Sequence, residues 1–164
     1  MARGRVERAA HPVVTLIAIP ERLLVAIYAH AVSTFPAECC GYLVGPAAGT
    51  AVDALVRCTN AQGTSEGASI DPMRGSETGY AIAGRELFEF ASSFRTERPA
   101  KIVYHSHPNG RAYFSALDRQ IAAGPVYPVQ HLVIGVQAGK VTEAAQFGWV
   151  AGADDHVELA RWHP

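Results

Sequence analysis

Short runs of apolar and β-branched residues alternate along the chain with segments of helical spacing. The strand-like runs cover residues 13–19, 40–45, 51–58, 101–104, 132–136 and 141–150, and a last short element is expected over residues 157–162. Helices are expected from Pro20 and Glu21 to near Pro36, over residues 79–95 and over residues 115–123. Because strands and helices mix without regular repetition of one strand–helix–strand unit, the pattern predicts an α+β fold with a mixed β-sheet flanked by helices.

Two of the expected helices carry apolar residues at helical spacing, which predicts the side that faces the core. These residues are Leu23, Leu24, Ile27 and Ala31 in the first helix and Ile82, Leu87, Phe88 and Phe94 in the second. Residues 60–78, in contrast, are rich in Gly, Ser and Thr and show no apolar period. Irregular segments of this length commonly have a function of their own.

Composition narrows the class of protein. The chain has 164 residues, of which 49% are hydrophobic, and a formal net charge of −1. We expect one domain over residues 11–164, preceded by a disordered tail over residues 1–10. The near-neutral charge argues against a nucleic-acid-binding protein that relies on bulk positive charge. The sequence shows neither a membrane-spanning run nor a signal-peptide cleavage pattern, so we expect a cytoplasmic protein with no membrane partner.

The cysteines are Cys39, Cys40 and Cys58, an odd number that favours a reducing compartment. Adjacent residues of a strand point to opposite faces, so Cys39 and Cys40 would not bind one metal ion together. We interpret all three as small buried apolar residues. A redox role for Cys39 or Cys40 is the alternative.

The densest group of reactive side chains follows the strand expected over residues 101–104. His105 and His107 are two residues apart, so in a strand they point to the same face. Asp118 lies three residues after Ser115, near the start of the next helix, and its carboxylate can face back toward the histidines. Two imidazoles and one carboxylate are the three protein ligands of a catalytic zinc site, which leaves the fourth position open for water.

A purely structural role explains the same residues without chemistry. Ser115 and Asp118 have the spacing of a capping box at a helix N-terminus. A His-x-His pair on a strand is often two semi-exposed histidines. The conjunction of both patterns at short range favours the metal site, and a capping hydroxyl on Ser115 can still face the metal.

A zinc hydrolase also needs a general base for its water. The candidate carboxylates are Glu38, Glu66, Asp71, Glu77 and Glu89. Glu38 follows Pro36 between a helix and a strand, where a rigid turn can aim a side chain into a site. Spacing alone does not choose among the five.

These motifs resemble the signature of JAMM (MPN-plus) metalloproteases, which is a Glu, then His-x-His, then seven residues, then Ser-x-x-Asp. The matching segments are Pro36–Gly45, Tyr104–Pro108 and Ser115–Asp118, with seven residues between His107 and Ser115. Further likeness to the small prokaryotic branch lies at Ile19-Pro20, Asn60, Ile70-Asp71-Pro72 and the terminal strands. Within that branch the chain is most similar to CysO–cysteine peptidases (Mec). The resemblance implies the cytidine-deaminase-like sandwich of the MPN/JAMM fold.

The resemblance also implies a role for each matched residue. His105, His107 and Asp118 would bind one Zn²⁺ per chain. Glu38 would be the base that takes a proton from the attacking water and passes it to the leaving amine. Ser115 would donate a hydrogen bond to the oxyanion.

The chain departs from the family pattern in two places. Phe114 precedes Ser115 where relatives often have Pro. Residues 73–79 extend the segment after Ile70-Asp71-Pro72, which can reshape the substrate groove. The family's mechanism therefore transfers more safely to this chain than its specificity.

Family members cut amide bonds next to the C-terminal Gly-Gly of ubiquitin-like proteins. For a single small prokaryotic domain this implies a sulfur-carrier protein as substrate and partner, as in cysteine biosynthesis, with release of cysteine or trimming of the carrier tail. We expect the tail to add a strand near residues 60–79. The alternatives are a non-catalytic MPN scaffold that binds partner proteins and a RadC-like DNA-associated protein. The oligomeric state stays open, with a homodimer as one option.

Overall fold

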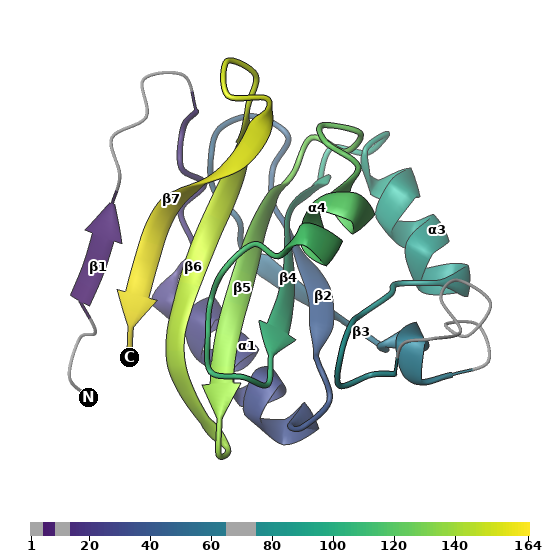
Figure 1. Ribbon diagram of the computed structural model, residues 1–164. Helices are drawn as coiled ribbons and strands as arrows, with labels where there is room; N and C mark the ends of the chain where they lie inside the picture. The colour runs from purple at the N-terminus through teal and green to yellow at the C-terminus, as the bar shows by residue number, and fades with distance from the viewer. Residues whose placement is uncertain (1–4, 9–13, 65–74) are drawn as a thin grey trace.

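The computed structural model describes residues 5–8, 14–64 and 75–164. Its seven strands form one sheet in the order β1-β7-β6-β5-β4-β2-β3 (Figure 1). The strands are β1 Arg5–Arg8, β2 Cys40–Val44, β3 Ala54–Cys58, β4 Ala100–His107, β5 Gln130–Gln137, β6 Lys140–Val150 and β7 Asp155–His163. The helices are α1 Glu21–Thr34, α3 Gly84–Ser93 and α4 Ala116–Ala122, with a 3₁₀ turn η1 at Ala61–Gly63. This mixed sheet with three α-helices confirms the predicted α+β class.

The central strands bury both faces of the sheet, because helices cover each face. Ile102 of β4 belongs to the same buried cluster as Ile27 of α1, on one face. Val103, the next residue, belongs to the cluster of Phe90 in α3, on the other face. The helix α4 packs Ala122 over the same face as α3, nearer β5 and β6. Figure 1 shows α1 behind the sheet and α4 in front of it.

The strands β4 and β5 are parallel, whereas the other described strand pairs are antiparallel. A parallel pair needs a crossover connection between its strands. Here the crossover carries α4. The chain therefore leaves the end of β4 at His107 and returns across the same face of the sheet, which brings the start of α4 back over that strand.

Residues 5–8 correct the expectation of a disordered tail. They form β1, which pairs antiparallel with β7 in a register that sets Val6 opposite Trp162. The edge of a sheet offers unpaired backbone groups to any extended segment, whatever its side-chain pattern. The composition of residues 1–10 did not reveal this pairing because it depends on the backbone of β7. The remainder of that stretch lies outside the described residues.

The strand expected over residues 13–19 is also wrong, since among its described residues, 14–19, only Ala18 forms a β-bridge, with Ala51. Two buried glutamine side chains form hydrogen bonds with the backbone of this segment. These bonds replace those that a neighbouring strand would make. Gln130 accepts from the backbone N–H of Ile17 at 3.1 Å and donates to Thr15. Gln146 donates to the carbonyl oxygen of Ile17 at 3.0 Å.

The second helix is shorter than expected, and a different side of it faces the core. It begins at Gly84 rather than at residue 79, because residues 79–81 run beside Asn60 and Ala61 and hydrogen-bond to them. Phe90 is its buried residue. Leu87 and Phe88, which we expected in the core, are 40% and 70% exposed.

The other expected elements are present with shifted bounds. The first helix, the short helix after Ser115 and the strands that contain residues 40–44, 101–104, 132–136 and 141–150 form as predicted, while β3 starts at Ala54 and β7 extends to His163. Much of the expected irregular segment, residues 65–74, lies outside the described residues. Among the helices that the structure describes, none is both long and apolar enough to cross a membrane.

Candidate metal centre

The structure brings His105, His107 and Asp118 together at one buried point. His105 and His107 lie on the last three residues of β4, on the face that α3 and α4 cover. Asp118 lies in the first turn of α4. The capping box that the sequence predicts fixes that turn: Ser115 Oγ accepts from the Asp118 N–H at 3.0 Å, and Asp118 Oδ2 accepts from the Ser115 N–H at 2.8 Å.

The three side chains form a triangle of donor atoms. The Nε2 atoms of His105 and His107 are 3.1 Å apart. Asp118 Oδ1 lies 3.0 Å from Nε2 of His105, and Oδ2 lies 3.3 Å from Nε2 of His107. A tetrahedral ion with bonds of about 2.0–2.1 Å separates its ligand atoms by roughly 3.3 Å. The spacing and the donor types therefore fit a metal ion bound by these three residues.

A hydrogen bond fixes the tautomer of His107 that a metal needs. Nδ1 of His107 lies 3.1 Å from the carbonyl oxygen of Arg111. A carbonyl oxygen only accepts, so Nδ1 carries the hydrogen and Nε2 of the neutral ring presents its lone pair to the centre of the triangle. Such outer partners are typical of metal-binding histidines.

His105 is held by stacking rather than by a second hydrogen bond. The ring of Tyr80 lies parallel to that of His105, with centroids 4.4 Å apart and an interplanar angle of 18°. Nδ1 of His105 has no hydrogen-bond partner within the described part of the chain. The orientation of this ring therefore depends on packing, and Tyr80 covers one of its sides.

Electrostatics in this buried group favour the protonation states of metal ligands at His105 and Asp118, whereas the carboxylates beside His107 favour its protonated form as long as no cation is bound. Burial lowers the pKa of His105. Burial also raises the pKa of Asp118, but the charges of His105 and His107 and the hydrogen bonds from them outweigh burial and hold that pKa far below its usual range. For His107, burial lowers the pKa, and the hydrogen bond to Asp118 and its charge more than compensate. An ionised carboxylate between two imidazoles is the form in which this set binds a cation.

Glu38 lies beside this cluster. It sits in the turn between α1 and β2 and is 7% exposed. Cys40 of β2 pairs with His105 of β4, and continuing that antiparallel register by two residues sets Glu38 opposite His107. The charge of Glu38 contributes to the raised pKa of His107, as expected for a nearby carboxylate. The structure thus brings the fourth predicted residue to the same end of β4.

Ser115 caps α4, and its geometry is compatible with the second role that the sequence left open. Its oxygen accepts the capping hydrogen bond, which leaves the hydroxyl hydrogen available to another acceptor. Because Asp118 is both the capping partner and a member of the ligand triangle, capping holds Ser115 next to the metal position. The cap and a site beside the metal are compatible in this geometry.

The competing carboxylates have other surroundings. Glu89 forms an exposed ion pair with Arg85 at 2.7 Å on α3. Glu77 is exposed on the turn over residues 75–78. Glu66 and Asp71 lie outside the described residues, as does the Ile70-Asp71-Pro72 segment.

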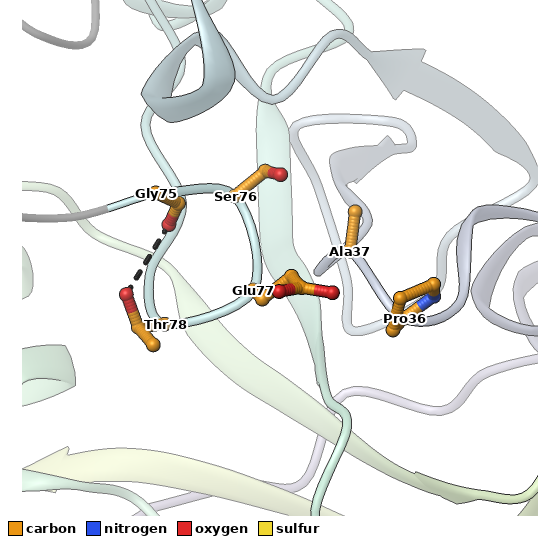
Figure 2. A pocket seen from close by; sticks show the side chains of 6 residues that line it. All are labelled: Pro36, Ala37, Gly75, Ser76, Glu77 and Thr78. Carbon is orange, nitrogen blue, oxygen red and sulfur yellow. Dashed lines mark hydrogen bonds between the residues drawn. The ribbon is translucent and has the colours of Figure 1, made fainter.

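A hollow of about 490 Å³ opens beside the turn that carries Glu38. Its described lining comes from that turn and from the segment after the undescribed loop, namely Pro36, Ala37, Gly75, Ser76, Glu77 and Thr78. Figure 2 shows these two segments facing each other, with the carboxylate of Glu77 between the turn of residues 75–78 and the Pro36 side. Glu38 is next in sequence to this lining, and its N–H donates to the carbonyl oxygen of Ser76, a lining residue, at 2.7 Å.

The three cysteines are buried and unbridged, as expected. Cys39 and Cys40 belong to the clusters on opposite faces of the sheet. Burial raises the pKa of Cys39 to about 11 and that of Cys58 to about 12, which keeps both thiols protonated.

Sequence reasoning missed Tyr80 and the support of the loop between β4 and α4. The Glu143 carboxylate accepts from the N–H of Ala112 at 2.7 Å, and Arg161 donates to the carbonyl oxygen of Ala112 at 2.9 Å. This pair, joined at 2.8 Å, holds the loop that supplies the Arg111 carbonyl to His107. No spacing in the sequence links β6 and β7 to that loop, so only the fold could reveal the contact.

Comparisons with known proteins identify a family and support the fold. The family of prokaryotic homologues of the JAB domain matches residues 20–150. A protein from Desulfitobacterium hafniense, solved in solution, is 22% identical, with a TM-score of 0.60 over 84% of this chain and 86% of that chain. A protein from Salinibacter ruber is 23% identical, with a TM-score of 0.56 over 85% of this chain and 86% of that chain. At these identities the two structures support the fold alone. No curated protein matches the chain.

Proposed function

The chain belongs to the prokaryotic homologues of the JAB domain, and on that basis we propose that it is a zinc-dependent peptidase of the JAMM type. Its substrate in this proposal is a ubiquitin-like sulfur-carrier protein. The amide bond after the carrier's C-terminal Gly-Gly is cleaved, which releases cysteine or trims the carrier tail. This reaction follows the CysO–cysteine peptidase branch, which the sequence resembles.

The observation that carries the proposal is the buried triangle of His105, His107 and Asp118, with Glu38 beside it. Three ligands leave one coordination position for a reacting group, as in hydrolytic rather than structural zinc sites. A zinc ion bound here would activate water near neutral pH and polarise the scissile carbonyl. MPN domains that act only as scaffolds lack these ligands, whereas this chain retains all three.

Each remaining residue has a distinct task in the proposed reaction. Glu38 accepts a proton from the attacking water and passes it to the leaving amine. The Ser115 hydroxyl, capping α4 through its oxygen, donates its hydrogen to the oxyanion that develops on the substrate carbonyl. Arg111 keeps the metal-binding nitrogen of His107 free of hydrogen.

The hollow between residues 36–37 and 75–78 is the proposed entry for the carrier tail. It adjoins the turn that positions Glu38, and part of its described wall, residues 75–78, belongs to the segment where we expected the tail to bind. A flexible Gly-Gly tail has no side chains at its end, so a narrow approach to buried groups suits it. Backbone hydrogen bonds to an extended segment would supply the affinity.

The decisive experiment is incubation of the zinc-loaded protein with sulfur carriers that bear C-terminal extensions, read by intact mass. We expect the product mass of a carrier that ends in Gly-Gly. The variant Asp118→Asn should lose zinc and cleavage, while Asp53→Asn, which alters an exposed pair with Arg98, should retain both. Cleavage that survives in Asp118→Asn and after chelation would refute the zinc mechanism. If no Gly-Gly carrier is cut, the substrate class is wrong.

A RadC-like role makes a separate prediction that a binding assay can test. It requires salt-dependent association with DNA, since phosphate contacts release counterions. We expect no such binding from a chain of net charge −1. Tight, salt-sensitive binding of duplex DNA would favour that role over the peptidase.

A further inference from the structure

The side-chain amide of Asn60 is fully engaged by backbone groups. Its Nδ2 donates to the carbonyl oxygens of Glu38 and Gly79, each at 3.0 Å, with a longer contact of 3.4 Å to Ser76. Its Oδ1 accepts from the N–H groups of Gln62 at 3.0 Å and Ala81 at 3.2 Å. A primary amide has two donor hydrogens and two acceptor lone pairs, so Asn60 uses its whole capacity here.

Two of these contacts lie on either side of Tyr80. The Gly79 carbonyl belongs to the peptide before Tyr80, and the Ala81 N–H belongs to the peptide after it. The backbone bond from the Ala61 N–H to the Ala81 carbonyl, at 2.8 Å, adds a third constraint. Asn60 therefore sets the position from which the Tyr80 ring stacks on His105.

A third contact holds Glu38. Asn60 binds the carbonyl of the peptide after Glu38, and the Ser76 carbonyl binds the N–H of the peptide before it. The next residue, Cys39, exchanges two bonds with Ser106, the middle residue of the His-x-His motif: the Cys39 N–H donates to Ser106 Oγ at 2.8 Å, and the Ser106 N–H donates to the Cys39 carbonyl at 3.1 Å. The backbone of Glu38 is thus fixed relative to β4 from both directions.

We propose that Asn60 is a positioning residue for the reaction, which holds Glu38 and Tyr80 in register with His105. This inference rests on the proposed peptidase function. The contact to Glu38 requires a donor, because the group bound there is a carbonyl oxygen. An aspartate at position 60 keeps the acceptors for Gln62 and Ala81 but loses both donors. The contacts that cap η1 and those that hold Glu38 can therefore be separated by one substitution.

The first test needs no substrate. Amide hydrogen exchange is measured in the zinc-loaded full-length chain for the wild type, Asn60→Ala, Asn60→Asp and the control Thr59→Ala. Thr59 is the exposed neighbour whose side chain binds Glu86 instead of Glu38 or Tyr80. We expect faster exchange at Ala81 in Asn60→Ala but not in Asn60→Asp, faster exchange at Glu38 in both, and no change in Thr59→Ala. Unchanged exchange at Glu38 in both Asn60 variants would show that Asn60 does not hold the Glu38 backbone, and would overturn the proposal.

The second test is kinetic. A misplacement of about 1 Å at a reacting group costs up to about 100-fold in rate, so we expect kcat to fall 10- to 100-fold in both Asn60 variants, with little change in KM and with one zinc per chain retained. Thr59→Ala should keep the wild-type kcat. If Asn60→Asp retains wild-type kcat, Asn60 serves only to cap η1 and the proposal fails. If Asn60→Ala does not fold, Asn60→Asp carries the test.

A double-mutant cycle separates positioning from general damage. In a Glu38→Gln background the base is already absent, so adding Asn60→Asp should lower the residual kcat less than threefold. A further 10-fold loss would show that Asn60 does not act through Glu38, and would overturn the part of the proposal that concerns Glu38. A wild type that cleaves no carrier refutes the proposed function instead, and the exchange measurements still decide whether Asn60 holds Glu38.

Discussion

Glu38 and Glu89 are the same residue type, one buried and one exposed, so a substitution at Glu89 is a control for the same substitution at Glu38. Glu38 is buried beside the ligand triangle, whereas Glu89 forms an exposed pair with Arg85. Replacing Glu38 by Gln removes the proton acceptor, and we expect kcat to fall by about 10²- to 10⁴-fold while zinc content stays at one per chain. Glu89→Gln should leave both unchanged. Steady-state cleavage rates and metal analysis check this prediction. If the kcat of Glu38→Gln lies within twofold of the wild-type value, Glu38 is not the base.

The capping role of Ser115 and the catalytic role that we propose for it can be separated by comparing Ala with Gly at this position. Ser115→Ala removes the cap, which costs about 1 kcal/mol of folding free energy, whereas Gly at an N-cap costs only a few tenths. Both changes remove the hydroxyl, so both should lower kcat by about 10²- to 10³-fold. Urea unfolding and cleavage rates together test this. An activity loss in Ser115→Ala that Ser115→Gly largely restores would mean that Ser115 acts only as a cap.

The ligands were predictable from sequence, but their surroundings were not. His105, His107 and Asp118 follow from two local rules: side chains two apart share a face of a strand, and a capping box sets the start of a helix. Both rules act within a few residues and held in the fold. Tyr80 and Asn60 act across the tertiary structure, and no periodicity marks a stacked ring or a saturated amide. Asn60 appeared in the family resemblance without any stated role.

At the scale of elements, the close contact between β5 and the loop after β4 gives a test of how the ligands are held. Gly135 pairs with His107, and a Cβ at Gly135 would lie 2.6 Å from the carbonyl carbon and oxygen of Gly110 and 2.8 Å from the nitrogen of Arg111. These are backbone atoms, so the loop must shift. Gly135→Ala should therefore lower the unfolding free energy by about 1–3 kcal/mol.

The same shift should weaken zinc binding by about 10- to 100-fold, because it moves the Arg111 carbonyl that orients His107. Chelator competition measures the affinity, and urea unfolding measures the stability. Gly152→Ala is the matched control, since a Cβ there meets nothing within 4 Å. Equal zinc affinity in Gly135→Ala and wild type would show that the loop does not position His107.

Two of the errors in element prediction share one physical cause. The apolar pattern of residues 13–19 predicted a strand, and Ile17 and Ile19 do pack on the core. The side chains of Gln130 and Gln146, however, form the hydrogen bonds with the backbone of this segment that a strand partner would make. The helix expected from residue 79 starts late because Asn60 binds the backbone there. In each case a polar side chain distant in sequence took the hydrogen bonds that a regular element would have made, and such competition is invisible to local propensity.

At the scale of the whole molecule, the face of the sheet that α3 and α4 cover buries another histidine besides the candidate metal ligands. This is His131 of β5, which packs against the rings of Phe114 and His156. Nδ1 of His131 has no hydrogen-bond partner among the described residues. Burial, with smaller effects of His156 and His105, lowers the pKa of His131 to about 3. The folded protein therefore keeps this imidazole neutral, and as a result the protein is less stable in acid.

The sign of the resulting pH dependence follows from the two states. The folded pKa of His131, about 3, lies below its ordinary value of 6.5, so between these limits the unfolded chain binds the proton and the folded chain does not. Stability is complete above pH 6.5 and falls as the pH drops. One pKa unit corresponds to about 1.4 kcal/mol, so this residue should cost about 2 kcal/mol between pH 6.5 and pH 5.

Urea unfolding of the metal-free protein at both pH values, for wild type and His131→Leu, isolates this contribution because the other titrating groups cancel in the difference. We expect His131→Leu to lose about 2 kcal/mol less than wild type over that interval, since leucine has no proton to bind. The control His163→Gln, at an exposed position, should follow the wild type. Equal losses of stability in wild type and His131→Leu would mean that the folded protein protonates His131 without cost, and that burial of His131 does not limit the stability of the protein in acid.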